Sequence, residues 1–107
     1  NEAITGGAVA LTNYHIVIWG CGNESTADES FSTAEQTQVA AFLASGGRLF
    51  TSGAEIAWDL DRASGPSAAD RNFFHNQLHA TYSADSSGIW TFGAVGGSIF
   101  SGTQAVL

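Results

Sequence analysis

Residues 14–20, YHIVIWG, constrain the fold more than any other stretch of this sequence. Ile16, Val17, Ile18 and Trp19 are consecutive β-branched or aromatic residues, and a glycine follows them. Because side chains alternate between the two faces of a strand, an uninterrupted apolar run is typical of a strand covered on both faces, as in a parallel sheet. We therefore expect a buried strand here.

A helix and a second strand are predicted to follow. Ser32 and Glu35 have the spacing of a capping box, which predicts a helix over Thr33–Ala44 that ends at two glycines. Arg48–Thr51 is the predicted second buried strand. Two strands joined through a helix in this way form a βαβ unit with parallel strands.

The later segments complete an α/β pattern. A helix is predicted over Ala54–Leu60, a second helix capped by Ser67 runs to about Ala80, and strands are predicted over 88–95 and 98–102. The 107 residues correspond to a single domain, 1–107. The order of elements predicts a three-layer sandwich with a mainly parallel sheet between helices. The chain starts at Asn1, and we expect it to be part of a longer secreted protein.

The charge balance excludes several classes of partner. Three arginines oppose ten carboxylates, lysine is absent, and the formal net charge is −7. Without a basic stripe, neither nucleic acid nor an anionic membrane surface is an expected partner. No stretch approaches the roughly 20 apolar residues that a membrane span requires. Neutral glycans and cations remain compatible, and the lysine-free, Ser/Thr/Gly/Ala-rich composition suggests a secreted or extracellular protein of the cell envelope.

The carboxyl ends of the two predicted buried strands form the expected site, because ligands of parallel sheets bind there. Trp58 and Trp90 would stack against sugar rings if exposed, or would otherwise belong to the core. Cys21 is either a reactive thiol at this edge or a small buried hydrophobe. The predicted ligand-binding residues are Cys21, Asn23, Glu24, Thr51, Ser52, Glu55 and Trp58.

Ser52 stands in a strand–turn–helix segment, between Thr51 and Gly53. A nucleophile elbow has this arrangement, although Phe50 occupies the place of its first glycine. Ser52 is therefore a candidate nucleophile of a small ester or amide hydrolase, or only the cap of the following helix. The candidate bases are His75 and His79, with Asp59 or Asp61 as a third member.

Two pairs of side chains suggest metal ligands. HNQLH at 75–79 resembles a zinc-binding helix, with Asn76 where the general base would stand, so His75 and His79 could share one Zn²⁺. Asp59 and Asp61 could hold Ca²⁺, or could instead form hydrogen bonds around Arg62 and the loop that follows. Apart from these ions, we expect no cofactor.

Three segments together resemble a known module: GGRLFTSGAEIAWDLD (46–61), FFHNQLHATY (73–82) and GGSIFSG (96–102). They are similar to the glutamine-amidotransferase-like, flavodoxin-like domain of secreted bacterial proteins labelled xanthan lyase or N-acetylmuramoyl-L-alanine amidase. The resemblance implies a class I amidotransferase-like sandwich, truncated in this chain, within an exported multidomain parent. It also implies work on extracellular polysaccharide or the cell wall.

The same resemblance argues against catalysis by this module. When the turn glycines are aligned, the nucleophilic cysteine of the amidotransferases falls on Thr51. We therefore expect a non-catalytic accessory domain that binds a glycan or peptidoglycan fragment, with the serine hydrolase and the metal-binding domain as alternatives. A shortened sheet would leave an exposed edge, through which the chain could form a homo-oligomer.

Overall fold

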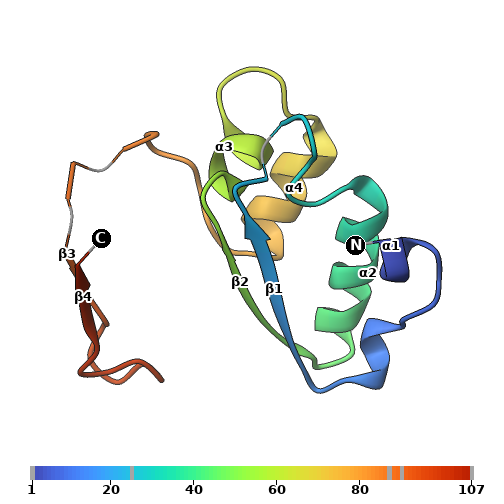
Figure 1. Cartoon of the computed structure of the whole chain (residues 1–107), viewed down its shortest axis with the longest axis horizontal. Coiled ribbons are helices and arrows are strands. Elements are labelled where there is room, and N and C mark those ends of the chain that lie inside the picture. Colours follow the sequence, from blue (N-terminus) through green and yellow to red (C-terminus); the bar gives the residue numbers. More distant parts are fainter. Residues whose placement is uncertain (1, 25, 87, 90, 107) are drawn as a thin grey trace.

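The computed structural model describes residues 2–24, 26–86, 88, 89 and 91–106. It is a small α/β structure in which a two-stranded parallel sheet is flanked by helices, with a separate two-stranded hairpin near the C-terminus (Figure 1). In chain order the elements are α1 (Glu2–Thr5), the 3₁₀ helix η1 (Leu11–Asn13), β1 (Ile16–Gly22), α2 (Thr33–Ala44), β2 (Arg48–Gly53), α3 (Ile56–Asp61), α4 (Ala68–Asn76), β3 (Thr91–Gly93) and β4 (Gln104–Val106).

The predicted βαβ unit is confirmed. Strands β1 and β2 pair in parallel, with Ile18 opposite Phe50 and a bulge between Gly20 and Gly22. Both strands extend beyond the predicted carboxyl ends, β1 to Gly22 and β2 to Gly53. Within the described residues, no helix has the length and apolarity needed to cross a membrane.

Helix α2 has the predicted bounds because both ends are specified locally. The Ser32 hydroxyl accepts from the backbone N–H of Glu35, and Glu35 Oε2 accepts from the backbone N–H of Ser32 at 2.8 Å. At the other end Gly46 adopts a φ of 90°, which favours glycine. Gly47 passes so close to the Phe42 ring that a Cβ there would lie 2.2 Å from it.

Helix α4 starts as predicted but ends earlier. Ser67 and Asp70 form a second capping box at its start. The helix stops at Asn76 rather than near Ala80, because His79 adopts a left-handed φ of 52°. The backbone N–H of Ala80 then donates to the Phe74 carbonyl, and Leu78 and Ala80 pack against the core.

The C-terminal region differs most from its prediction. Strand β3 covers only part of 88–95, and the strand predicted at 98–102 is wrong, because this segment forms consecutive turns. Gly97 and Gly102 have φ values of 82° and 88°, which turn the chain away from an extended path. The partner of β3 is instead β4, in an antiparallel pair that is separate from the β1/β2 sheet.

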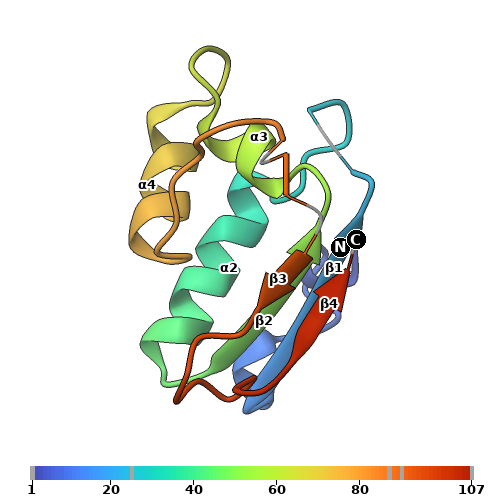
Figure 2. The same ribbon diagram turned by 90° about the vertical axis from the view of Figure 1, so that its left-hand side faces the viewer.

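Within the described residues, helices cover one face of the β1/β2 sheet. Figure 2 shows α2 and α4 on the same side of β1 and β2. Trp19 points to that side, is only 6% exposed and stacks on Phe31 at 5.0 Å between ring centroids. On the outer face Ile16 is 62% exposed and Ile18 is 78% exposed. The expected cover on both faces is therefore wrong for the described residues. The core lies between the inner face and the helices, and comprises Leu11, Trp19, Cys21, Phe31, Val39, Phe42, Ile56, Leu60, Phe73 and Phe74.

Candidate functional site

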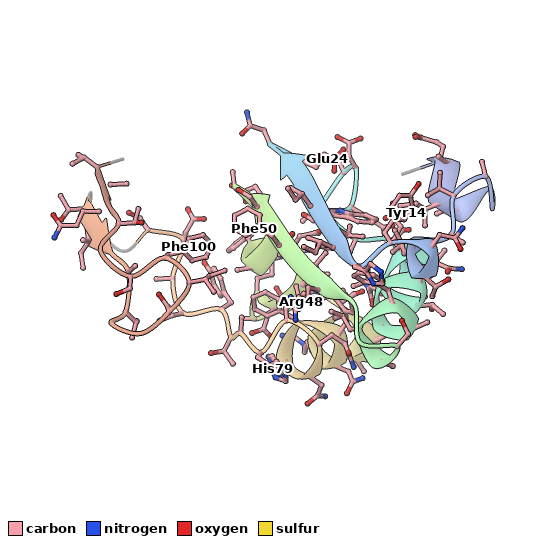
Figure 3. The ribbon with its side chains drawn as sticks, turned by 90° about the horizontal axis from the view of Figure 1, so that it is seen from below. Tyr14, Glu24, Arg48, Phe50, His79 and Phe100 are labelled. Carbon is pink, nitrogen blue, oxygen red and sulfur yellow. The ribbon has the colours of Figure 1, made fainter. Side chains whose placement is uncertain are left out.

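The carboxyl ends of β1 and β2 are held close together. The backbone N–H of Ala54 donates to the Gly22 carbonyl at 2.9 Å, and a Cβ on Gly53 would lie 2.7 Å from the Cβ of Cys21. Asn23 follows β1 and is exposed, and the next residue, Glu24, is half-buried. Figure 3 shows Glu24 at the end of β1. The predicted residues of both strands thus share one edge of the sheet.

Two of the predicted residues at this edge point inward. Cys21 is buried, and its thiol donates to the Ser30 carbonyl at 3.4 Å. Burial raises the pKa of Cys21, and the nearby Glu24 carboxylate raises this pKa further. The thiolate is therefore disfavoured. The Thr51 hydroxyl is also buried, and it has no hydrogen-bond partner among the described residues.

An aromatic cluster lies where α3 leaves this edge. Trp58 is in the first turn of α3 and is 38% exposed. Tyr82 meets it edge to face, with ring centroids 5.7 Å apart at an interplanar angle of 71°. The Arg62 guanidinium lies over the indole, with its Cζ 5.5 Å from the ring centroid. This cluster places apolar rings next to hydrogen-bond donors at the surface.

Carboxylates adjoin the tyrosine of this cluster. Partial burial raises the pKa of Tyr82, and the charges of Asp85 and Glu55 raise it further. The phenol therefore stays protonated at neutral pH and can donate a hydrogen bond. Glu55 immediately precedes α3 and is half-buried, so it belongs to the same surface as Trp58.

Asp61 connects α3, α4 and the segment that carries Tyr82. Its Oδ2 accepts from the backbone N–H of Tyr82 at 2.8 Å. Its Oδ1 lies 3.0 Å from His75 Nε2 and 3.3 Å from Arg71 Nη1. The hydrogen bond with His75 lowers the pKa of Asp61 most, followed by the bond from the Tyr82 N–H. Asp61 thereby positions Tyr82 beside Trp58.

Asp59 connects α3 to the loop after β1. Its Oδ2 accepts from the backbone N–H of Ser30 at 2.8 Å, and its Oδ1 lies 3.9 Å from Arg62 Nη1. The hydrogen bond of this carboxylate is thus to the loop after β1, and its contact with Arg62 is an ion pair beyond hydrogen-bond distance. In the part of the chain that the structure describes, no three His, Cys, Asp or Glu side chains are close enough together to hold a metal ion.

The members of the predicted catalytic triad are only partly brought together. His75 and Asp61 are in contact, as one version of that triad requires. Ser52 is exposed on β2, and among the described residues no histidine hydrogen bonds to its hydroxyl. His79 is also exposed and follows the end of α4. Within the described residues, His75 and Asp61 therefore form a pair to which Ser52 does not hydrogen bond.

Sequence reasoning missed Tyr82, whose position depends on a contact between distant segments. It is 24 residues from Trp58 along the chain, and the hydrogen bond from its N–H to Asp61 helps to hold it there. No local pattern signals such a contact. Trp90 lies outside the described residues. Comparisons with protein-family models, curated proteins and solved structures found no significant match to this chain.

Proposed function

We propose that this chain is a non-catalytic, ligand-binding accessory domain that binds a glycan or peptidoglycan fragment over Trp58 and Tyr82. The observation that carries the proposal is the contact between the partly exposed Trp58 and the half-buried Tyr82, with Arg62 over the indole and the charges of Glu55 and Asp85 acting on the phenol. Binding sites for small ligands combine aromatic surface with a few well-placed polar groups in this manner.

The chemistry of this surface suits a neutral or weakly charged sugar. An aromatic ring offers apolar area to the C–H face of a pyranose, and the Tyr82 hydroxyl and Glu55 carboxylate can hydrogen bond to sugar hydroxyls. A chain with a net charge of −7 repels polyanions. A neutral glycan or a peptidoglycan fragment is therefore favoured over an acidic polymer.

The resemblance in sequence supplies the biological setting of this proposal. In that setting the chain belongs to a secreted bacterial protein that acts on polysaccharide or peptidoglycan. Its parallel unit would be part of a flavodoxin-like, class I amidotransferase-like sandwich. The absence of a cysteine at Thr51 and the buried thiol of Cys21 support a binding role over amidotransferase chemistry.

Isothermal titration against neutral oligosaccharides and peptidoglycan fragments tests this function. We expect saturable binding to at least one of them, and we expect Trp58→Ala to weaken it by about tenfold or more. Tyr14→Ala is the matched control, because Tyr14 is an exposed aromatic residue on the approach to β1. No binding to any member of the panel, or equal weakening by both substitutions, would contradict the proposal.

The His75–Asp61 contact favours a second candidate function, a serine-type hydrolase. Such an enzyme would require Ser52 to approach His75, so that the imidazole could accept the hydroxyl proton. Ester and amide hydrolysis by the wild-type chain and by Ser52→Ala distinguishes the two functions. Equal rates would reject the hydrolase, whereas a large loss of activity in the variant would support it.

A further inference from the structure

We propose that this chain forms a homodimer through an apolar patch on the outer face of the β1/β2 sheet, covered by the same patch of a second copy. The patch consists of Ile16 and Ile18 on β1, Phe50 on β2, and Val95 and Phe100 in the C-terminal region. All five side chains are among the exposed large hydrophobic residues of the chain.

The patch is continuous from the sheet to the hairpin. Ile18 and Phe50 are register partners on neighbouring strands, so their side chains share the outer face. Phe50 also meets Phe100, with ring centroids 6.2 Å apart at an interplanar angle of 60° (Figure 3). An open hollow of about 560 Å³ adjoins this contact and is lined by Phe50, Ala94, Val95, Phe100 and Thr103, with Gly93 and Ser98.

Most of the exposed large hydrophobic side chains lie in the two regions that contribute to the patch. Among the described residues, eight of the ten are on the outer sheet face or in the C-terminal region. Of these ten, only Tyr14 and Trp58 lie elsewhere. Monomers seldom expose contiguous apolar patches beyond a few hundred square ångströms, and larger ones mark sites of association.

The distribution of charge favours this patch as the place where a second copy binds. Two copies that each carry a net charge of −7 repel one another over most of their surfaces. The patch avoids this repulsion, since β1, β2 and residues 86–107 contain no Asp or Glu side chain. Arg48, at the start of β2, carries the only charged side chain in these segments. Another copy can therefore approach closely at this patch.

The shape and size of the patch agree with a two-fold interface. A two-fold axis pairs a surface with itself, so each copy must offer both a projection and a recess. The largely exposed Ile18 side chain supplies a projection, and the hollow lined by Phe50 and Phe100 supplies the recess. Each of the three sheet side chains has a surface of at most about 250 Å² and is only partly exposed. Their combined exposed area is therefore smaller than the roughly 800 Å² that each partner buries in a stable interface. The C-terminal region is therefore a necessary part of it.

Sedimentation velocity over a range of protein concentrations tests the dimer. We expect the wild-type chain to shift from monomer to dimer as concentration rises. Ile18→Lys places an ammonium in the centre of the patch and should raise the dimer dissociation constant by about tenfold or more. Ala41→Lys makes the same change of charge on an exposed position of α2 and should leave the constant unchanged.

Two further measurements keep the test decisive. Circular dichroism tests whether Ile18→Lys is folded. Val95→Lys repeats the sedimentation test at an exposed residue of the C-terminal region, which does not belong to the core. A wild-type chain that stays monomeric at every concentration would overturn the proposal. A dimer that both patch variants leave unchanged would overturn the assignment to this face, with the free edge of the sheet then the alternative.

Discussion

The two faces of the β1/β2 sheet carry similar side chains in opposite environments. On the inner face Trp19 stacks on Phe31 beneath α2 and α4. The preceding residue, Ile18, lies on the outer face and is largely exposed. Apolar residues on a strand therefore do not by themselves specify that both of its faces are buried within the chain. The inner face is buried by helices of this chain, and the side chains of the outer face are exposed.

The largest expected effect compares these neighbouring residues directly. Trp19→Ala should lower the free energy of unfolding by about 3–5 kcal/mol, because it leaves a cavity among packed rings. Ile18→Ala should lower it by about 1 kcal/mol or less, since the side chain is already in water. Urea denaturation at a concentration where the chain is monomeric measures both values. Similar losses would mean that both faces are equally buried.

The second prediction concerns the contact that fixes the helical layer over the inner face. Asp61→Asn removes a carboxylate that bonds to α4 and to Tyr82, so the melting temperature at neutral pH should fall. The folded pKa of Asp61 lies below its ordinary value of 3.8. Its stabilising contribution is therefore complete above that value and is lost as pH falls through the folded pKa.

Thermal melts from pH 7 to pH 3 give the corresponding control. The difference between the wild-type chain and Asp61→Asn should narrow below about pH 4. Asp28→Asn removes an exposed carboxylate and should retain the acid dependence of the wild-type chain. A difference between wild type and Asp61→Asn that stays constant with pH would show that the charge of Asp61 does not stabilise the layer.

A smaller effect is expected at the start of α2, the helix that lies over Trp19. Ser32→Ala removes one half of the capping box and should cost about 1 kcal/mol of stability. Thr33→Ala is the neighbouring control, because this exposed side chain makes no capping bond and alanine favours the helix. Equal losses measured by urea denaturation would indicate that the capping box contributes nothing.

Much of the parallel unit could be predicted from the sequence, because local signals specify it. The Ser32–Glu35 capping box and the glycines after Ala44 define α2 at both ends, and the apolar runs define β1 and β2. The prediction of a strand at 98–102 was wrong because the local signals there favour turns. Glycines with positive φ values surround a short apolar run there, and turn formation outweighs β propensity.

The candidate site was less predictable than the fold. The rule that places ligands at the carboxyl ends of parallel strands indicated the edge around Cys21, Ser52 and Glu55, and the structure brings these residues to one edge. Their surroundings depend on contacts between distant segments. The bond from Asp61 to the Tyr82 N–H and the packing that buries Cys21 are of this kind, and sequence spacing does not encode them.

Amide hydrogen exchange on the dilute, monomeric chain tests the difference between the two faces most directly. If the core is confined to the inner face, the paired amides of β1 and β2 and those of α2 should exchange slowly together. Residues 91–106, which pair only with each other beyond the outer face, should then exchange far faster. Protection of residues 91–106 equal to that of β1 would contradict the account, because it would mean that the chain covers both faces of its own sheet.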